Sequence, residues 1–181
     1  YFDCFSTIGK WAGKDPLATW KTDHLLNEME RCSIQGALVY ANAAAEMHPD
    51  VGNPIVNEAC RANDRLYPCW VGLPHQTGEF PEPAKLVAQM QDQGVKALKL
   101  FPSVYQFPMD DLCMAPLLGA LEEAGLLFII DRGQEGHPNV EISWQELRWV
   151  AETFPKLNIL LHGVRWEATR EFTPLAMKYP N

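Results

Sequence analysis

Charged side chains stand directly after short apolar runs at two points of the chain. Asp131 and Arg132 follow "LLFII", and His162 follows "NILL". A charge at the end of a buried strand needs a partner or a task, because burying an unpaired charge is costly. Carboxylate and imidazole groups are also the usual general acids and bases of enzymes. We therefore predict that Asp131 and His162 are catalytic.

Each of these residues also has a structural reading. Asp131 could cap a turn or pair with Arg132 or Arg165, and His162 could be a core histidine bonded to a backbone carbonyl. For either residue considered alone, the structural role would be enough to explain its position. Because Lys99 and His75 are expected near the same strand ends, the group as a whole favours a site.

A further set of side chains near these strand ends suits the binding of an anionic substrate. The set comprises His75, Lys99, Arg132, Arg165 and Trp166. Lysine and arginine pair with carboxylate and phosphate groups. The sequence therefore predicts a small anionic metabolite as the partner, bound by these residues.

Lys99 has two readings within the run "VKALKLFP". Strand alternation puts Ala97 and Lys99 on one face, and Leu98 and Leu100 on the other. An inward Lys99 must pair with a carboxylate such as Asp131 or contact an anionic ligand. An outward Lys99 would be solvated, with its stem against apolar surface.

The elements that would position these residues are apolar runs separated by amphipathic stretches. Ser143 and Glu146 form a capping box at the start of one expected helix, and Gly125 is a typical stop for another. The runs are Tyr1–Gly9, Gly36–Ala41, Leu66–Pro74, Val95–Pro102, Leu126–Asp131 and Asn158–Gly163. Near-continuous apolar strands alternating with helices predict an α/β fold with a parallel sheet.

Two architectures satisfy this pattern, a doubly wound sheet and a TIM-type (β/α) barrel. No GxGxxG or GxxxxGK[ST] motif follows any of the runs, so a nucleotide-binding sheet lacks its phosphate cradle. We expect one domain over residues 1–181, with six β–α units. A barrel needs about two more units, and "KYPN" at the end normally leads into another strand. We therefore expect a barrel without its last two strands; a six-stranded open sheet is the alternative.

Composition excludes several classes of partner. The net charge is −8, which disfavours nucleic acid, and no segment has the length and apolarity of a membrane span. The five cysteines are scattered without a CxxC pair, which favours a reducing cytoplasm. Tryptophans on expected helices, such as Trp144 and Trp149, fit either a homo-oligomer interface or packing within the helix layer.

The order of these segments resembles the amidohydrolase-related (amidohydrolase 2) family of metal-dependent TIM-barrel hydrolases and decarboxylases. The similarity runs through "YFDCFSTIG", "GVKALKLFP", "LLFIID", "FPKLNILLHGVRW" and "FTPLAMKYPN". Its most specific pieces are the first segment, "LLHG" and "KYPN". The resemblance implies a (β/α) barrel, strand-end chemistry and a divalent metal ion such as Zn²⁺ or Mn²⁺.

The metal-binding part of the resemblance is degenerate. The family's first strand reads Asp-x-His-x-His-x-Gly, and aligning Asp3 and Gly9 with it puts Phe5 and Thr7 at the histidine positions. Phenylalanine has no donor atom for a metal, and a threonine hydroxyl is a weak one. Asp131 and His162 are left as possible ligands, with His75 as a third if its segment folds inward. A family-type metal centre is therefore disfavoured, and we assign no cofactor.

Two functions from different classes remain. The first is an amidohydrolase-like hydrolase or lyase that acts without the usual metal centre on a small carboxylate-bearing metabolite such as a lactone or amide. The second is a non-catalytic ligand-binding or regulatory protein on the same barrel. The loss of both first-strand histidines favours the second, and the charged strand ends suit either.

Overall fold

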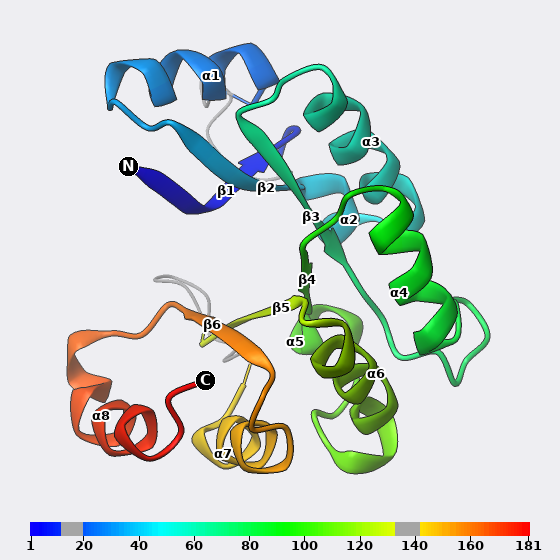
Figure 1. Cartoon of the computed structure of the whole chain (residues 1–181), viewed down its shortest axis with the longest axis vertical. Coiled ribbons are helices and arrows are strands. Elements are labelled where there is room, and N and C mark those ends of the chain that lie inside the picture. The colour runs from blue at the N-terminus through cyan, green and yellow to red at the C-terminus, as the bar shows by residue number, and fades with distance from the viewer. Residues whose placement is uncertain (12–19, 133–141) are drawn as a thin grey trace. The chain divides into compact units, whose positions relative to one another are not determined.

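The computed structural model describes residues 1–11, 20–132 and 142–181, which form two compact units (Figure 1). The first unit comprises Tyr1–Val71 and Met90–Lys96, and the second comprises Gly72–Gln89 and Ala97–Asn181. No helix among the described residues is long and apolar enough to cross a bilayer. Whether the chain is one domain stays a prediction.

The first unit is built on three parallel strands. Strands β1 (Phe2–Ile8), β2 (Gly36–Ala41) and β3 (Leu66–Val71) pair in chain order. Every residue of β2 is buried, as expected for a central strand whose two faces are both covered. This burial explains why the run "GALVYA" is apolar throughout instead of alternating.

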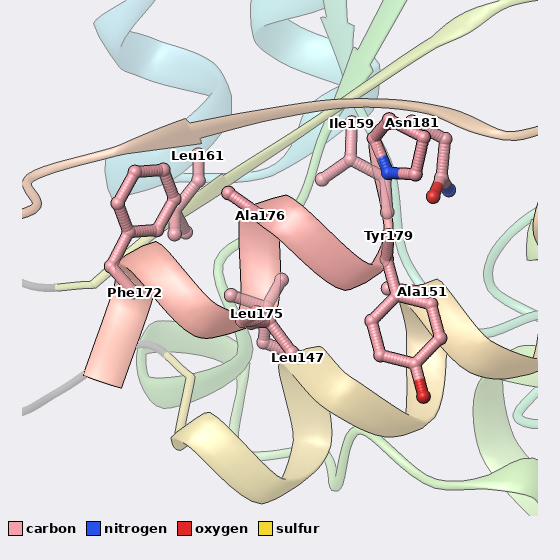
Figure 2. Close-up of a pocket in the computed structure, with 10 residues that line it drawn as sticks. Leu147, Ala151, Ile159, Leu161, Phe172, Leu175, Ala176, Tyr179 and Asn181 are labelled. Carbon is pink, nitrogen blue, oxygen red and sulfur yellow. The ribbon is translucent and has the colours of Figure 1, made fainter. Parts of the chain in front are cut away.

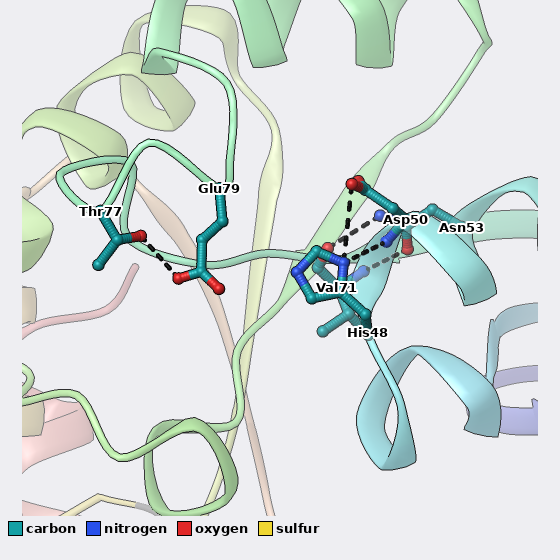
Figure 3. Close-up of polar contacts among 6 residues, drawn as sticks. All are labelled: His48, Asp50, Asn53, Val71, Thr77 and Glu79. Atoms are coloured by element: carbon teal, nitrogen blue, oxygen red, sulfur yellow. Dashed lines mark hydrogen bonds and ion pairs between the residues drawn. The ribbon is translucent and has the colours of Figure 1, made fainter.

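Three helices accompany these strands: α1 (Thr22–Arg31), α2 (Asn42–Glu46) and α3 (Pro49–Arg61). His48 caps α3, since its Nδ1 accepts a hydrogen bond from the backbone N–H of Asp50 (Figure 3). The buried side chain of Asn53 bonds both the N–H and the C=O of Val71, each at 2.9 Å. Helix α3 is therefore fixed to the end of β3.

The second unit contains the other three parallel strands. Strands β4 (Ala97–Lys99), β5 (Leu127–Asp131) and β6 (Asn158–His162) again pair in chain order. The helices of this part are α5 (Pro102–Tyr105), α6 (Asp111–Ala124), α7 (Trp144–Thr153), the 3₁₀ turn η1 (Trp166–Ala168) and α8 (Thr169–Lys178). Helix α4 (Pro83–Asp92) runs from the second unit into the first. The six strands and their alternation with helices confirm the α/β fold.

Two helix ends agree with the signals seen in the sequence. The capping box is present, with both reciprocal hydrogen bonds between Ser143 and Glu146. Gly125 ends α6 in the left-handed conformation, at φ +64°. Helix α1 begins at Thr22, and Lys21 precedes it without a side-chain cap.

The thiol of Cys60 in α3 gives the folded chain a pH dependence. Burial raises the pKa of Cys60 from 9.0 to about 12. The unfolded thiol therefore loses its proton first, and this contribution to stability is present below about pH 9 and is lost as the pH rises towards 12. We expect the urea midpoint to fall over that window. Cys60→Ala should flatten the fall and Cys32→Ala, at an exposed position, should not; equal slopes in all three proteins would contradict the assignment.

Candidate functional site

Strand register places three of the predicted site residues on one side of the second unit's sheet. Lys99 of β4 pairs with Ile129 of β5, and two residues further on Asp131 pairs with His162 of β6. Because side chains two apart in a strand share a face, Lys99, Asp131 and His162 project to the same side. We call these three residues the strand-end cluster.

The cluster is centred on one carboxylate oxygen. Oδ2 of Asp131 lies 3.0 Å from Nδ1 of His162 and 3.5 Å from Nζ of Lys99. The side chains of Asp131 and Lys99 are 5% and 1% exposed, whereas that of His162 is 33% exposed. The ion pair is thus buried, and the imidazole connects it to the surface.

This geometry selects a histidine tautomer. A carboxylate oxygen at 3.0 Å from Nδ1 accepts a hydrogen bond from it, so Nδ1 carries the proton and the basic lone pair lies on Nε2. The arrangement is that of an oriented general base.

Lys99 is held from several directions. Its carbonyl accepts a hydrogen bond from the N–H of Gly72 at 3.0 Å, and its ammonium lies 4.8 Å from the ring centroid of Phe101. Phe101 was not among the predicted site residues; it lies two residues after Lys99, beyond the end of β4 and directly before α5. In the structure the side chain of Lys99 therefore points inward, and Asp131 is its partner.

Arg132 follows Asp131 but its side chain is committed elsewhere. The guanidinium stacks on Trp144 at 4.4 Å from the ring centroid and donates a hydrogen bond to the carbonyl of Ile142. Burial lowers the pKa of Arg132, and the carboxylates of Glu171 and Glu146 partly oppose this. Arg132 therefore ties the end of β5 to the start of α7, and its role in substrate binding stays a prediction.

His75 lies in the segment after β3 and forms a second imidazole–carboxylate pair. Its Nε2 is 3.3 Å from Oε2 of Glu82. Its Nδ1 is buried and has no hydrogen-bond partner among the residues that the structure describes. In the same segment the hydroxyl of Thr77 donates to Glu79 (Figure 3). Among the described residues, we find no hydrogen bond or ion pair between His75 and the strand-end cluster.

The last two candidates follow β6. Arg165 precedes η1 and is exposed, and Trp166 is 86% exposed. Within the described ranges neither side chain is bonded to the strand-end cluster. The predicted contact of Arg165 and Trp166 with substrate therefore stays a prediction.

The first strand does not offer a family-type metal site. Phe5 has no donor atom and packs against Tyr40, with ring centroids 5.8 Å apart. The carboxylate of Asp3 accepts hydrogen bonds from the backbone N–H of Phe5 at 2.8 Å and from the hydroxyl of Ser6 at 2.6 Å. These bonds stabilise a bulge in β1, where the register with β2 shifts between Asp3 and Ser6.

The second unit fits a metal ion no better. No group of three or more His, Cys, Asp or Glu side chains in the described ranges could hold one. The Asp131 oxygen that faces His162 already has an ammonium beside it, which would repel a cation. Within residues 1–11, 20–132 and 142–181, the side chains therefore do not fit the metal centre that the resemblance implies.

A cavity of about 250 Å³ lies on the other side of β6, between α7 and α8 (Figure 2). Ile159 and Leu161 point into it from β6, and Phe172 and Leu175 close it from α8. By alternation His162 points away from this cavity. Its lining is apolar except for Tyr179 and Asn181, so it carries none of the chemistry of the strand-end cluster.

Comparison with known proteins relates the chain to solved barrels. No protein-family model and no curated protein matches the sequence. An uncharacterised TIM-barrel protein from Bordetella bronchiseptica superimposes with a TM-score of 0.68 and 18% identity, over 88% of this chain. The chain has the fold of part of a TIM barrel, with six parallel strands that alternate with helices. It spans 57% of the length of the Bordetella protein.

Two further TIM-barrel matches carry enzyme names. An amidohydrolase II protein matches 99% of this chain and 73% of its own length, with a TM-score of 0.65 and 11% identity. A probable 2-pyrone-4,6-dicarboxylic acid hydrolase from Acinetobacter baumannii matches 88% of this chain and 57% of its own, with a TM-score of 0.56 and 8% identity. At these identities the likeness shows the fold, and the argument for function has to come from the site.

Proposed function

We propose that this protein is a hydrolase or lyase that acts, without a metal ion, on a small carboxylate-bearing metabolite such as a lactone or amide. The observation that carries the proposal is the strand-end cluster, in which a buried Asp131 holds Nδ1 of the partly exposed His162. An imidazole oriented by a buried carboxylate is an established device for proton transfer.

Hydrolysis by this cluster would need one base and one water molecule. Nε2 of His162 takes a proton from the water as its oxygen attacks the carbonyl carbon, and Asp131 stabilises the imidazolium. The C–O or C–N bond then breaks, and the imidazolium returns the proton to the leaving oxygen or nitrogen. Both atoms and charge balance without a co-reactant.

The nature of the substrate is supported by the charges and by one comparison. The protein carries a net charge of −8, so a bound anion needs local cations, and Arg165 is an exposed arginine after β6. The matched pyrone dicarboxylic acid hydrolase is named for a lactone with two carboxylates, and its crystals contain citric acid. Both observations favour a carboxylate-bearing substrate.

The test is a screen of lactones, amides and carboxylates with the wild-type protein and His162→Ala. We expect the substitution to lower the turnover of any substrate at least about 10²-fold, because the general base is lost. His48→Asn is the matched control, since it removes a histidine but keeps a good acceptor at the start of α3. Unchanged activity in His162→Ala would overturn the proposal, and ligand binding without turnover would favour the non-catalytic alternative.

A further inference from the structure

The positive charge beside the catalytic carboxylate belongs to the protein itself. We propose that the Lys99 ammonium is the internal counter-ion of Asp131 and takes the place of a metal ion at the strand-end cluster. In this role Lys99 is a positioning residue: its ammonium pairs with Oδ2 of Asp131, and the same oxygen holds Nδ1 of His162. The inference builds on the proposed function, because it assigns the charge balance of the same site.

Burial makes a counter-ion necessary. Asp131 is 5% exposed, and a carboxylate removed from water is stable only when a cation or several donors compensate its charge. His162 alone could do so only as an imidazolium, and it would then have no lone pair to act as a base. Lys99 supplies a positive charge 3.5 Å from the same carboxylate.

The position of Lys99 explains why a metal ion would be excluded. Its ammonium and His162 approach the same oxygen, Oδ2 of Asp131, which is where an ion shared by the carboxylate and the imidazole would also bind. Two cations a few ångströms apart in a buried site repel each other strongly. The hydrogen bond from Gly72 and the Phe101 ring hold Lys99 on the site.

Other charges near the cluster do not provide this compensation. The Arg132 guanidinium is stacked on Trp144, where the carboxylates of Glu146 and Glu171 act on it. Arg165 is exposed beyond the end of β6. Lys99 forms an ion pair with Asp131 at 3.5 Å.

The experiment observes the ring nitrogens of His162 by ¹⁵N NMR in metal-free protein, with Zn²⁺ as the added probe. In the wild type we expect the tautomer with the proton on Nδ1, and no change in the His162 signals when Zn²⁺ is added. Lys99→Gln should shift the ring signals towards imidazolium or a mixed tautomer, and Lys99→Arg should restore them. The signals of His48, in the first unit, control for changes unrelated to the cluster.

Two results would overturn the inference. One is a wild-type protein whose His162 signals respond to stoichiometric Zn²⁺, and the other is a Lys99→Gln variant with unchanged His162 signals. If Lys99→Gln does not fold, the Zn²⁺ titration of the wild type and of Lys99→Arg still decides the question. Neither readout requires turnover, so a protein without activity in the screen could still confirm the internal counter-ion.

Discussion

Replacing Lys99 by methionine is expected to lower the free energy of unfolding by about 3–5 kcal/mol. The reason is the burial of its partner: with Lys99 removed, the carboxylate of Asp131 stays 5% exposed and loses the cation at 3.5 Å. Methionine fills a similar volume, so the loss reports the charge and not a cavity. Urea unfolding followed by tryptophan fluorescence at pH 7 measures it.

A double variant separates the charge effect from packing. Lys99→Met combined with Asp131→Leu removes both ions, and replacing a buried ion pair by apolar residues is often neutral or stabilising. We expect the double variant to recover most of the stability that Lys99→Met loses. Lys85→Met, at an exposed position in α4, should change stability by less than about 0.5 kcal/mol. A loss below about 1 kcal/mol in Lys99→Met would show that the pair is not buried in solution.

The residue types of the strand-end cluster could be predicted from the sequence, because each stands at the end of an apolar run. The convergence of Lys99 and His162 on one carboxylate oxygen of Asp131 could not be predicted from the sequence. The pairing of Asp131 with His162 depends on how β5 and β6 align, and no local pattern states that register. The sequence therefore supplied candidates, and the sheet selected three of them.

Arg132 shows how alternation limits such predictions. Neighbouring residues of a strand project to opposite faces, so a charged residue directly after Asp131 is directed away from the face that Asp131 uses. Trp144, at the start of α7, is the partner that Arg132 finds there. The pattern "DR" suggested two site residues, whereas only Asp131 joins the cluster in the structure.

Helix α3 has mixed signals in the sequence. Its start carries the usual signals, with Pro49 in the first turn and Asp50 beside it, but Pro54 interrupts its interior. The local helix propensity of this segment therefore argues against a helix. Tertiary contacts stabilise the helix instead, such as the two hydrogen bonds between Asn53 and Val71. Contacts distant in sequence decide this element, and a local pattern does not contain them.

Introducing a side chain at Gly52 in the first unit should be strongly destabilising. A Cβ built at Gly52 in α3 would lie 2.5 Å from Cα of Ala44 in α2 and would overlap the backbone nitrogen and Cβ of the same residue. Because backbone atoms cannot rotate away, the two helices would have to separate. We expect Gly52→Ala to cost about 3 kcal/mol, at the upper end of overpacking effects, measured by urea unfolding.

Gly119 in α6 provides the matched control, because it is also a helical glycine. The nearest atom to a Cβ at Gly119 is Cε1 of Phe154 at 3.8 Å, an ordinary contact. Alanine is a better helix former than glycine, so Gly119→Ala should be neutral or stabilising by up to about 1 kcal/mol. The difference between the two variants isolates the close approach of α2 and α3, because propensity alone favours alanine at both positions. Equal stability of the two variants would show that these helices do not pack at this distance in solution.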